Sequence, residues 1–234
     1  MYNPIELSKK TEQIVVKDNL KKYYRFRPTR FYGGISTADT VGCNLRCKFC
    51  WSSNSVWNAN NTGQFYTPDV VAEKLQSIAD KKGYHQLRIS GGEPTIGIQH
   101  LVELLEKIKS KYLFILETNG ILLGFDEQFV DCLSYFENLH VRVCLKGADS
   151  EEFSFFTGAN VGFEYQIKAL QYLKEKQISF NIALVSVNTE KKQRLFQKLI
   201  ELGLDRIMFE EEEIKLYPMV RKRLRNEGLL NVFE

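Results

Sequence analysis

The sequence contains no apolar run of the roughly 18 residues that a membrane-spanning helix needs. Its first residues, MYNPIELSKKTEQ, also lack the apolar stretch of a signal peptide, so we expect a cytoplasmic protein with no membrane partner. No internal repeat, low-complexity segment or Pro/Ser-rich linker marks a domain boundary. A formal net charge of +3 is too small an excess to indicate a nucleic-acid partner by itself. Together these absences favour one globular domain.

Hydrophobic residues make up 44% of the 234 residues, which excludes a disordered or collagen-like chain. They form strand-like runs that alternate with segments of helical periodicity. A first strand is predicted at 31–40, and the next helix begins near Pro68 with Thr67 as its N-cap. Five more pairs follow, with strands at 85–90, 112–118, 140–146, 179–187 and 205–210 and helices near 99–110, 126–137, 163–176, 190–202 and 213–228.

Six strand–helix units predict an α/β fold with a parallel sheet and right-handed connections. Such a sheet is either open and doubly wound or an incomplete barrel. In both cases ligands bind at the carboxyl ends of the strands. Residues that carry chemistry should therefore follow the strands directly.

Three of the five cysteines lie within eight residues, in the segment VGCNLRCKFCW after the first strand. Disulfides do not explain such a cluster in a reducing compartment. Cys43, Cys47 and Cys50 have the spacing C-x3-C-x2-C, which lets thiolates surround one soft-metal centre. Three ligands suggest a [4Fe–4S] cluster with one open iron. A zinc site completed by a distant residue remains an alternative, and the candidates for that fourth ligand are His85, His100, His140 and Cys144.

The pattern C-x3-C-x-aromatic-C, with Phe49 as the aromatic residue, resembles the signature of the radical S-adenosylmethionine (radical SAM) superfamily. The resemblance covers residues 31–210. It implies a (βα)6 partial TIM barrel at 31–228, with an N-terminal extension at 1–30 and a C-terminal tail at 229–234. It also implies a [4Fe–4S] cluster and S-adenosylmethionine (SAM) as cofactors, and an external one-electron donor of the flavodoxin or ferredoxin type. The implied reaction is reductive cleavage of SAM to a 5′-deoxyadenosyl radical, which abstracts a hydrogen atom from a substrate.

Two motifs at later strand ends strengthen this resemblance. ISGGEPT follows the second strand, and the resemblance implies that Gly91, Gly92, Glu93 and Pro94 bind the amino group of SAM. ETNG ends the third strand, and Thr118 and Asn119 are implied contacts of the SAM ribose or methionine. The alternatives are an ordinary glycine turn in the first case and an Asn-Gly turn or helix cap in the second.

The fourth strand, VRVCLKG, alternates polar and apolar residues. Alternation places Arg142, Cys144 and Lys146 on one face, which should line the barrel. Lys146 is expected to pair with the SAM carboxylate, and Arg142 is either a further barrel-lining group or a buried ion-pair partner. Cys144 is either a packing residue, as Cys132 is expected to be, or a catalytic thiol that donates a hydrogen atom to a substrate radical. Within the acidic run at 210–213, Glu210 is the candidate for reaching the barrel mouth.

The size and layout are similar to those of glycyl-radical-enzyme activases, which implies a protein or peptide substrate. The chain departs from them in having Cys144 and Lys146 where activases usually have Asp-x-Lys. The alternative is modification of tRNA or a nucleoside. Basic and aromatic residues alternate in KKYYRFRPTR (21–30), a composition that suits RNA contact but that also fits packing on the barrel. A third hypothesis is an iron–sulfur electron carrier or sensor. The long loop WSSNSVWNANNTGQFY after the cysteines is expected to contact substrate.

Overall fold

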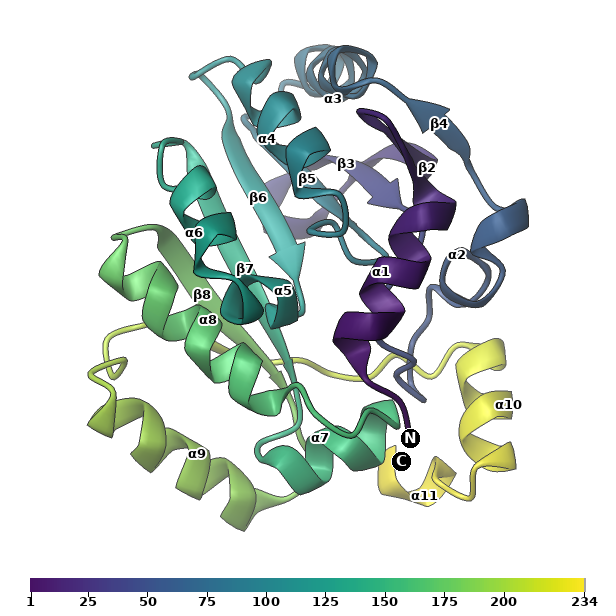
Figure 1. Ribbon diagram of the computed structural model, residues 1–234, viewed down its shortest axis with the longest axis vertical. Coiled ribbons are helices and arrows are strands. Elements are labelled where there is room, and N and C mark those ends of the chain that lie inside the picture. The colour runs from purple at the N-terminus through teal and green to yellow at the C-terminus, as the bar shows by residue number, and fades with distance from the viewer. Residues whose placement is uncertain (234) are drawn as a thin grey trace.

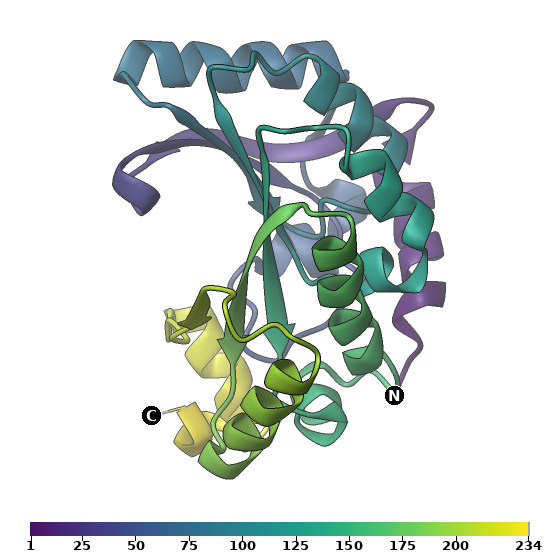
Figure 2. The same ribbon diagram turned by 90° about the vertical axis from the view of Figure 1, so that its left-hand side faces the viewer.

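The computed structural model describes residues 1–233, and its centre is one curved, mostly parallel sheet (Figures 1 and 2). Six parallel strands are hydrogen-bonded to one another in the order in which they follow in the sequence. They are β3 (Ile35–Thr40), β5 (Gln86–Gly91), β6 (Leu113–Thr118), β7 (Leu139–Lys146), β8 (Ser179–Val185) and β9 (Phe209–Glu211). A doubly wound sheet would reverse this order, so the consecutive order identifies the incomplete barrel.

Helices cover the convex face of this sheet, as Figure 2 shows. The crossover helices are α3 (Pro68–Lys82), α4 (Ile98–Glu106), α6 (Glu127–Leu133), α8 (Phe163–Glu175) and α9 (Thr189–Glu201). Short helices α5 (Ile121–Phe125) and α7 (Ser150–Thr157) precede α6 and α8, and neither was predicted as a helix. Apolar side chains between sheet and helices form one continuous core. The predicted (βα)6 partial TIM barrel is confirmed.

Local signals set the starts of two helices where the sequence predicted them, whereas α6 ends at Leu133 and not near 137. The Thr67 hydroxyl accepts a hydrogen bond from the N–H of Val70 and so caps α3, while Asp126 caps α6 by accepting from the N–H of Gln128. Gly83 ends α3 in the left-handed conformation that glycine adopts most easily. Since helix ends are defined by these few residues, the prediction of α3 was accurate. Helix α4 ends earlier than predicted, at Glu106.

The N-terminal residues are part of the sheet. Helix α1 (Pro4–Val15) leads to β1 (Val16–Lys17) and β2 (Leu20–Thr29), and β2 pairs antiparallel with β3. Strand β4 (Gln64–Tyr66) pairs with the other edge of β2. Residues 1–30, expected as an extension of the barrel, therefore lengthen its first edge.

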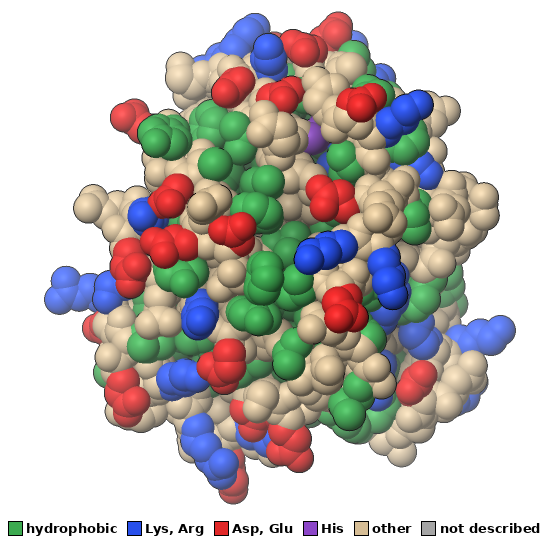
Figure 3. Space-filling model, viewed as in Figure 1, with side chains coloured by type: hydrophobic (Ala, Val, Ile, Leu, Met, Phe, Trp, Pro, Cys, Tyr) green, Lys and Arg blue, Asp and Glu red, His purple; other side chains and the backbone are tan. Residues whose placement is uncertain are grey.

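This placement removes two basic side chains of 21–30 from any RNA contact, whereas Arg25 stays half exposed. Lys21, Lys22 and Tyr23 are buried, and Lys22 Nζ donates to the backbone carbonyls of Ala59 and Asn60. The alternative, in which the aromatic residues pack on the barrel, is confirmed by Tyr23. Strand β2 pairs on both sides, and carbonyls of other loops surround the ammonium groups of Lys21 and Lys22, which is why these basic side chains lie inside. On the face in Figure 3 acidic and basic side chains are interspersed, so that face carries no basic strip.

The C-terminal residues close one side of the barrel mouth. Strand β9 is shorter than the predicted 205–210 strand, and the last long helix, α10, spans Pro218–Asn226. The long loop after the cysteines forms α2 (Ser53–Trp57) and a 3-10 turn, η2 (Ala59–Asn61), before β4. Trp51 stacks on Tyr217 just before α10. In residues 1–233 no helix has the length and apolar character needed to cross a membrane.

Candidate functional site

The interior of the barrel is polar, unlike the branched apolar filling of a complete TIM barrel. Register places inward side chains of adjacent strands side by side in layers. One layer contains Asp39, Ser90, Glu117, Arg142 and Asn181; the layer nearer the amino ends contains Thr37, Arg88, Ile115, His140 and Ser179. An interior lined in this way favours a polar ligand, because an apolar one would leave these groups without partners.

The three cysteines lie on a loop that the rest of the chain fixes firmly. The N–H of Lys48 donates to the carbonyl of Phe156, and Arg223 Nη1 donates to the carbonyl of Cys50 at 2.6 Å. Phe49 is buried and packs edge-on against Phe156. The aromatic position of the motif thus anchors the cysteine loop on α7.

The three thiols are free and stand close enough to affect one another. Burial raises the pKa of Cys43 well above its usual range and that of Cys47 to about 12, and the neighbouring thiols raise both further. The positive charge of Lys146 acts in the opposite direction on Cys47 and Cys50. Buried neutral thiols beside cationic groups are a donor set that binding of an electron-poor metal centre would stabilise as thiolates.

Two of the four candidates for the fourth ligand of a zinc ion, His100 and His140, have other partners in the structure. In residues 1–233, no three Cys, His, Asp or Glu side chains converge on one point as ligands of one ion must. The ligands of a [4Fe–4S] cluster each bind a different iron and need not converge. His100 bonds to the Asn19 carbonyl and the Tyr23 hydroxyl, and His140 bonds to Ser179 and Asn181.

The paired glycines of GGEPT let two segments of the backbone, around Gly92 and Gly42, come into contact. A Cβ on Gly92 would lie 2.0 Å from the carbonyl oxygen of Gly42, and Gly91 has a φ of +94°. Because both side chains are absent, the N–H of Gly92 donates to Thr40 O and the N–H of Glu93 donates to Gly42 O at 2.7 Å. The glycines thus bring the loop after β5 against the residues that precede Cys43.

The Glu93 carboxylate is 1% exposed and already has four donors within the chain. Its Oε1 accepts from the N–H and hydroxyl of Thr95 and from the hydroxyl of Thr118, and its Oε2 accepts from the N–H of Asn119. Glu93 therefore ties GGEPT to ETNG. The predicted side-chain contact with the SAM amino group would have to compete with these donors.

Asn119 continues the connection to the cysteine loop. Its Nδ2 donates to Asn44 Oδ1 at 2.7 Å and lies 3.9 Å from Cys43 Sγ. Gln166 Nε2 donates to the carbonyls of Asn119 and Cys144. Three motifs that are far apart in the sequence thus form one hydrogen-bonded unit.

Lys21 holds the same unit from β2. Its side chain is 0% exposed, and its ammonium group donates to the carbonyl oxygen of Pro94 at 2.5 Å, to that of Glu93 at 3.4 Å and to that of Ile96. Burial lowers the pKa of Lys21 to about 7. This role could not be predicted, because nothing near Lys21 in the sequence indicates acceptors more than seventy residues away.

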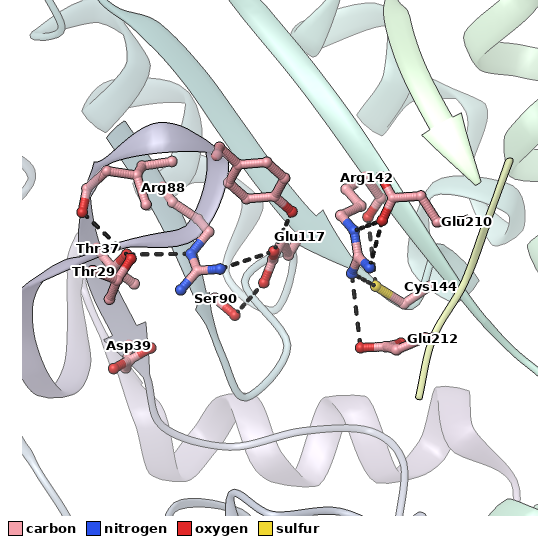
Figure 4. Close-up of polar contacts among 12 residues, drawn as sticks. Thr29, Thr37, Asp39, Arg88, Ser90, Glu117, Arg142, Cys144, Glu210 and Glu212 are labelled. Atoms are coloured by element: carbon pink, nitrogen blue, oxygen red, sulfur yellow. Dashed lines mark hydrogen bonds and ion pairs between the residues drawn. The ribbon is translucent and has the colours of Figure 1, made fainter. Parts of the chain in front are cut away.

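The inward face of β7 confirms the predicted alternation (Figure 4). Arg142 Nε and Nη2 donate to Glu210 Oε2 at 3.1 and 2.9 Å, and Arg142 Nη1 lies 3.2 Å from Cys144 Sγ. Arg142 is therefore a buried ion-pair partner, and Glu210 does reach the barrel mouth. Burial raises the pKa of the Cys144 thiol to about 12, so it carries its proton at neutral pH.

Lys146 pairs with Glu212 in this structure. Its Nζ lies 3.3 Å from Glu212 Oε2 and stands over the Phe49 ring at 5.9 Å from the centroid. Lys146 and Arg142 hold the pKa of the Glu212 carboxyl below its usual range. A SAM carboxylate at this place would share Lys146 with Glu212, a residue that the sequence analysis did not single out.

A second charged group, also not predicted, lies across the barrel on β5 and β6 (Figure 4). Arg88 Nη1 donates to Glu117 Oε1 at 3.1 Å, and the Ser90 hydroxyl donates to Glu117 Oε2 at 2.6 Å. Tyr32, before β3, donates its hydroxyl to the same carboxylate. The signal available in the sequence was Glu117 itself, which directly precedes the two ETNG residues singled out.

A family model for the radical SAM superfamily matches residues 37–199. The chain belongs to the radical SAM superfamily. Members of this superfamily use a [4Fe–4S] cluster and SAM, and the donor set of Cys43, Cys47 and Cys50 fits such a cluster.

Curated relatives in the superfamily have several activities. A protein of Methanocaldococcus jannaschii named "Putative glycyl-radical enzyme activating enzyme" is 29% identical over 110 residues, which are 44% of this chain and 40% of that protein. A GTP 3′,8-cyclase of Aquifex aeolicus is 31% identical over 86 residues, 36% of this chain and 27% of that protein. The matched regions thus span less than half of either relative.

Solved structures share the fold at low sequence identity. Streptococcus suis SuiB bound to its precursor peptide SuiA has a TM-score of 0.61 and 21% identity, covering 82% of this chain and 45% of that one. The enzyme anSMEcpe with bound AdoMet and a peptide has a TM-score of 0.55 and 19% identity, covering 81% and 56%.

Proposed function

We propose that this chain cleaves SAM reductively to a 5′-deoxyadenosyl radical that abstracts a hydrogen atom from a protein or peptide substrate. The main observation that supports this proposal is the single hydrogen-bonded unit formed by Cys43, Glu93 and Asn119. It holds a soft-metal donor set directly beside the two loops to which the resemblance assigns SAM. The bound cluster would supply the electron for the cleavage, received from a flavodoxin or ferredoxin.

The residues of the chain would divide the work by position. Cys43, Cys47 and Cys50 would bind the cluster. The backbone carbonyls of Gly91 and Gly92 would receive the amino group of SAM, because the Glu93 carboxylate already has four donors and Lys21 donates to the carbonyls of Glu93 and Pro94. Thr118 and Asn119 would set the position of the ribose or methionine, and Lys146 would bind the carboxylate.

Cys144 would act as a hydrogen-atom donor in this scheme. Its thiol is protonated at neutral pH and is held against Arg142 on the inner face of β7. Transfer of its hydrogen atom to a substrate radical forms a C–H bond and breaks the S–H bond. One electron from the external donor and one proton then restore the thiol.

A protein or peptide substrate is supported by the names of similar proteins. One curated relative bears the name "Putative glycyl-radical enzyme activating enzyme", and two of the structural neighbours were solved with peptides. The second candidate is a nucleotide. The polar layers inside the barrel favour it, and several relatives are GTP 3′,8-cyclases.

Extract fractions distinguish the substrate classes. The reconstituted protein, SAM and dithionite are incubated anaerobically with the macromolecular or the small-molecule fraction of a cell extract, and 5′-deoxyadenosine is measured. We expect the macromolecular fraction to stimulate its formation and protease treatment to remove the effect. If only the small-molecule fraction stimulates formation of 5′-deoxyadenosine, the substrate is a small molecule such as a nucleotide. If nuclease treatment of the macromolecular fraction removes the stimulation, the substrate is RNA. If no mixture forms 5′-deoxyadenosine, the proposed reaction is wrong, and the hypothesis of an iron–sulfur electron carrier or sensor remains.

A further inference from the structure

One buried amide on the cysteine loop has a donor without a partner. Asn44 is 0% exposed, and its Nδ2 forms no hydrogen bond with any atom of residues 1–233. Buried polar atoms are almost always satisfied, so an orphan of this kind calls for a partner that the protein chain itself does not supply. Asn44 directly follows Cys43, so the orphan stands on the loop that carries the cluster ligands.

The orientation of this amide is fixed by a chain of hydrogen bonds. The backbone N–H of Ile121 can only donate, and it donates to Asn119 Oδ1 at 3.0 Å. Asn119 Nδ2 must therefore be the atom that donates to Asn44 Oδ1 at 2.7 Å. Turning the Asn44 amide over would place two donors against each other, so Nδ2 is the atom left without a partner.

The surroundings of Cys43 show what such a donor would meet. Asn44 Oδ1 lies 3.9 Å from Cys43 Sγ, and the N–H of Leu45 donates to the same sulfur at 3.3 Å. The loop thus already directs one donor at a sulfur ligand. Sulfur atoms of iron–sulfur clusters accept hydrogen bonds, and these bonds help to set the reduction potential.

We propose that Asn44 Nδ2 donates a hydrogen bond to a sulfur atom of the cluster bound through Cys43 and thereby raises its reduction potential. The reason is electrostatic: reduction adds a negative charge to the cluster, and a donor stabilises the more negative state. Asn119, which contacts the GGEPT carboxylate, fixes this donor, so the amide pair links the SAM loops to the electron-accepting site. The inference rests on the cluster of the proposed function but not on SAM cleavage.

The test is an EPR-monitored redox titration of the reconstituted protein without SAM or substrate. Asn44→Ala removes the amide, and Asn44→Asp keeps the acceptor for Asn119 but removes the donor. We expect either variant to lower the equilibrium constant for reduction about tenfold, a midpoint about 59 mV more negative for one electron. Asn138→Ala is the matched control, because its Nδ2 donates to the carbonyl of Tyr112. That control should titrate like the wild type.

Unchanged midpoints in fully iron-loaded Asn44→Ala and Asn44→Asp would overturn the proposal. If neither variant retains iron, the wild-type protein decides the question. Its asparagine side chains are labelled with 15N, and pulsed EPR of the reduced cluster should then detect a nitrogen coupling stronger than that of Asn119 Nδ2, which lies 3.9 Å from Cys43 Sγ. Absence of that coupling also overturns the proposal. A wild-type protein that assembles no [4Fe–4S] cluster would instead refute the cofactor site itself.

Discussion

The backbone N–H of Asn119 donates to the carboxylate of Glu93 over 2.8 Å, which joins the ends of β5 and β6. In Glu93→Gln, Oε1 keeps its three donors, so the new NH2 group faces the N–H of Asn119. Two opposed buried donors cost about 1–3 kcal/mol. We therefore expect the free energy of unfolding in urea to fall by about 2 kcal/mol.

The same substitution should weaken SAM binding, because the two loops lose their mutual position. Equilibrium dialysis of the reconstituted protein should show an affinity lower by about tenfold, which corresponds to about 1.4 kcal/mol. Glu106→Gln on the exposed face of α4 is the control and should change neither quantity appreciably. Wild-type affinity in Glu93→Gln would show that the carboxylate does not position the loops.

Arg142 and Glu210 should be energetically coupled. The Arg142 side chain is 11% exposed and forms two hydrogen bonds to one carboxylate oxygen of Glu210. A double-mutant cycle with Arg142→Met and Glu210→Gln should give a coupling energy of about 2 kcal/mol in urea denaturation. The exposed pair Arg194–Glu190 on α9 is the matched control and should give less than about 0.5 kcal/mol. Equal coupling in the two pairs would contradict the buried position of Arg142.

His100 should make the fold sensitive to acid. Burial lowers its pKa from 6.5 to about 4, so between these values the unfolded chain binds a proton that the folded chain does not. Stability is therefore lost as the pH falls from 6.5 towards 4, by about 3 kcal/mol in total. His100→Gln should flatten this part of the stability curve, measured by urea denaturation at several pH values. Parallel curves for the two proteins would show that His100 does not titrate as expected.

Cys144→Ala should separate SAM cleavage from the fate of the substrate radical. The variant should keep its iron content and its rate of 5′-deoxyadenosine formation without substrate, because Cys144 bonds to none of the three cluster ligands. With substrate, the product should change or its yield should fall. Cys132, expected to be a packing residue, is instead exposed on α6, and Cys132→Ala should behave as wild type. An unchanged product at an unchanged rate in Cys144→Ala would leave Cys144 as a packing residue.

The fold was predictable where local patterns determine it. The strands after β3 are β-branched or apolar runs bounded by turns, and Thr67 and Asp126 are short-range capping signals. Strand β2 was not predicted, because its many basic residues are typical of a solvent-exposed segment. Lys21 and Lys22 are buried there only because carbonyls from other loops surround their ammonium groups.

The site was predictable to the extent that strand ends meet at one edge of a parallel sheet. This rule brought Cys43, Glu93 and Asn119 together correctly. The rule does not say which side chains bond to one another, so the saturation of Glu93 and the pairing of Lys146 with Glu212 were not foreseen. Asn44 was also missed, since its partner lies 75 positions away in the sequence.

The most direct test of the central claim is anaerobic SAM cleavage by the reconstituted protein and its cysteine variants. With SAM and dithionite, the wild type and Cys132→Ala should bind a [4Fe–4S] cluster and form 5′-deoxyadenosine. Alanine at Cys43, Cys47 or Cys50 should abolish both the cluster and the product. A wild-type protein that assembles the cluster but forms no 5′-deoxyadenosine would contradict the account. A variant of Cys43, Cys47 or Cys50 that still forms 5′-deoxyadenosine would also contradict it.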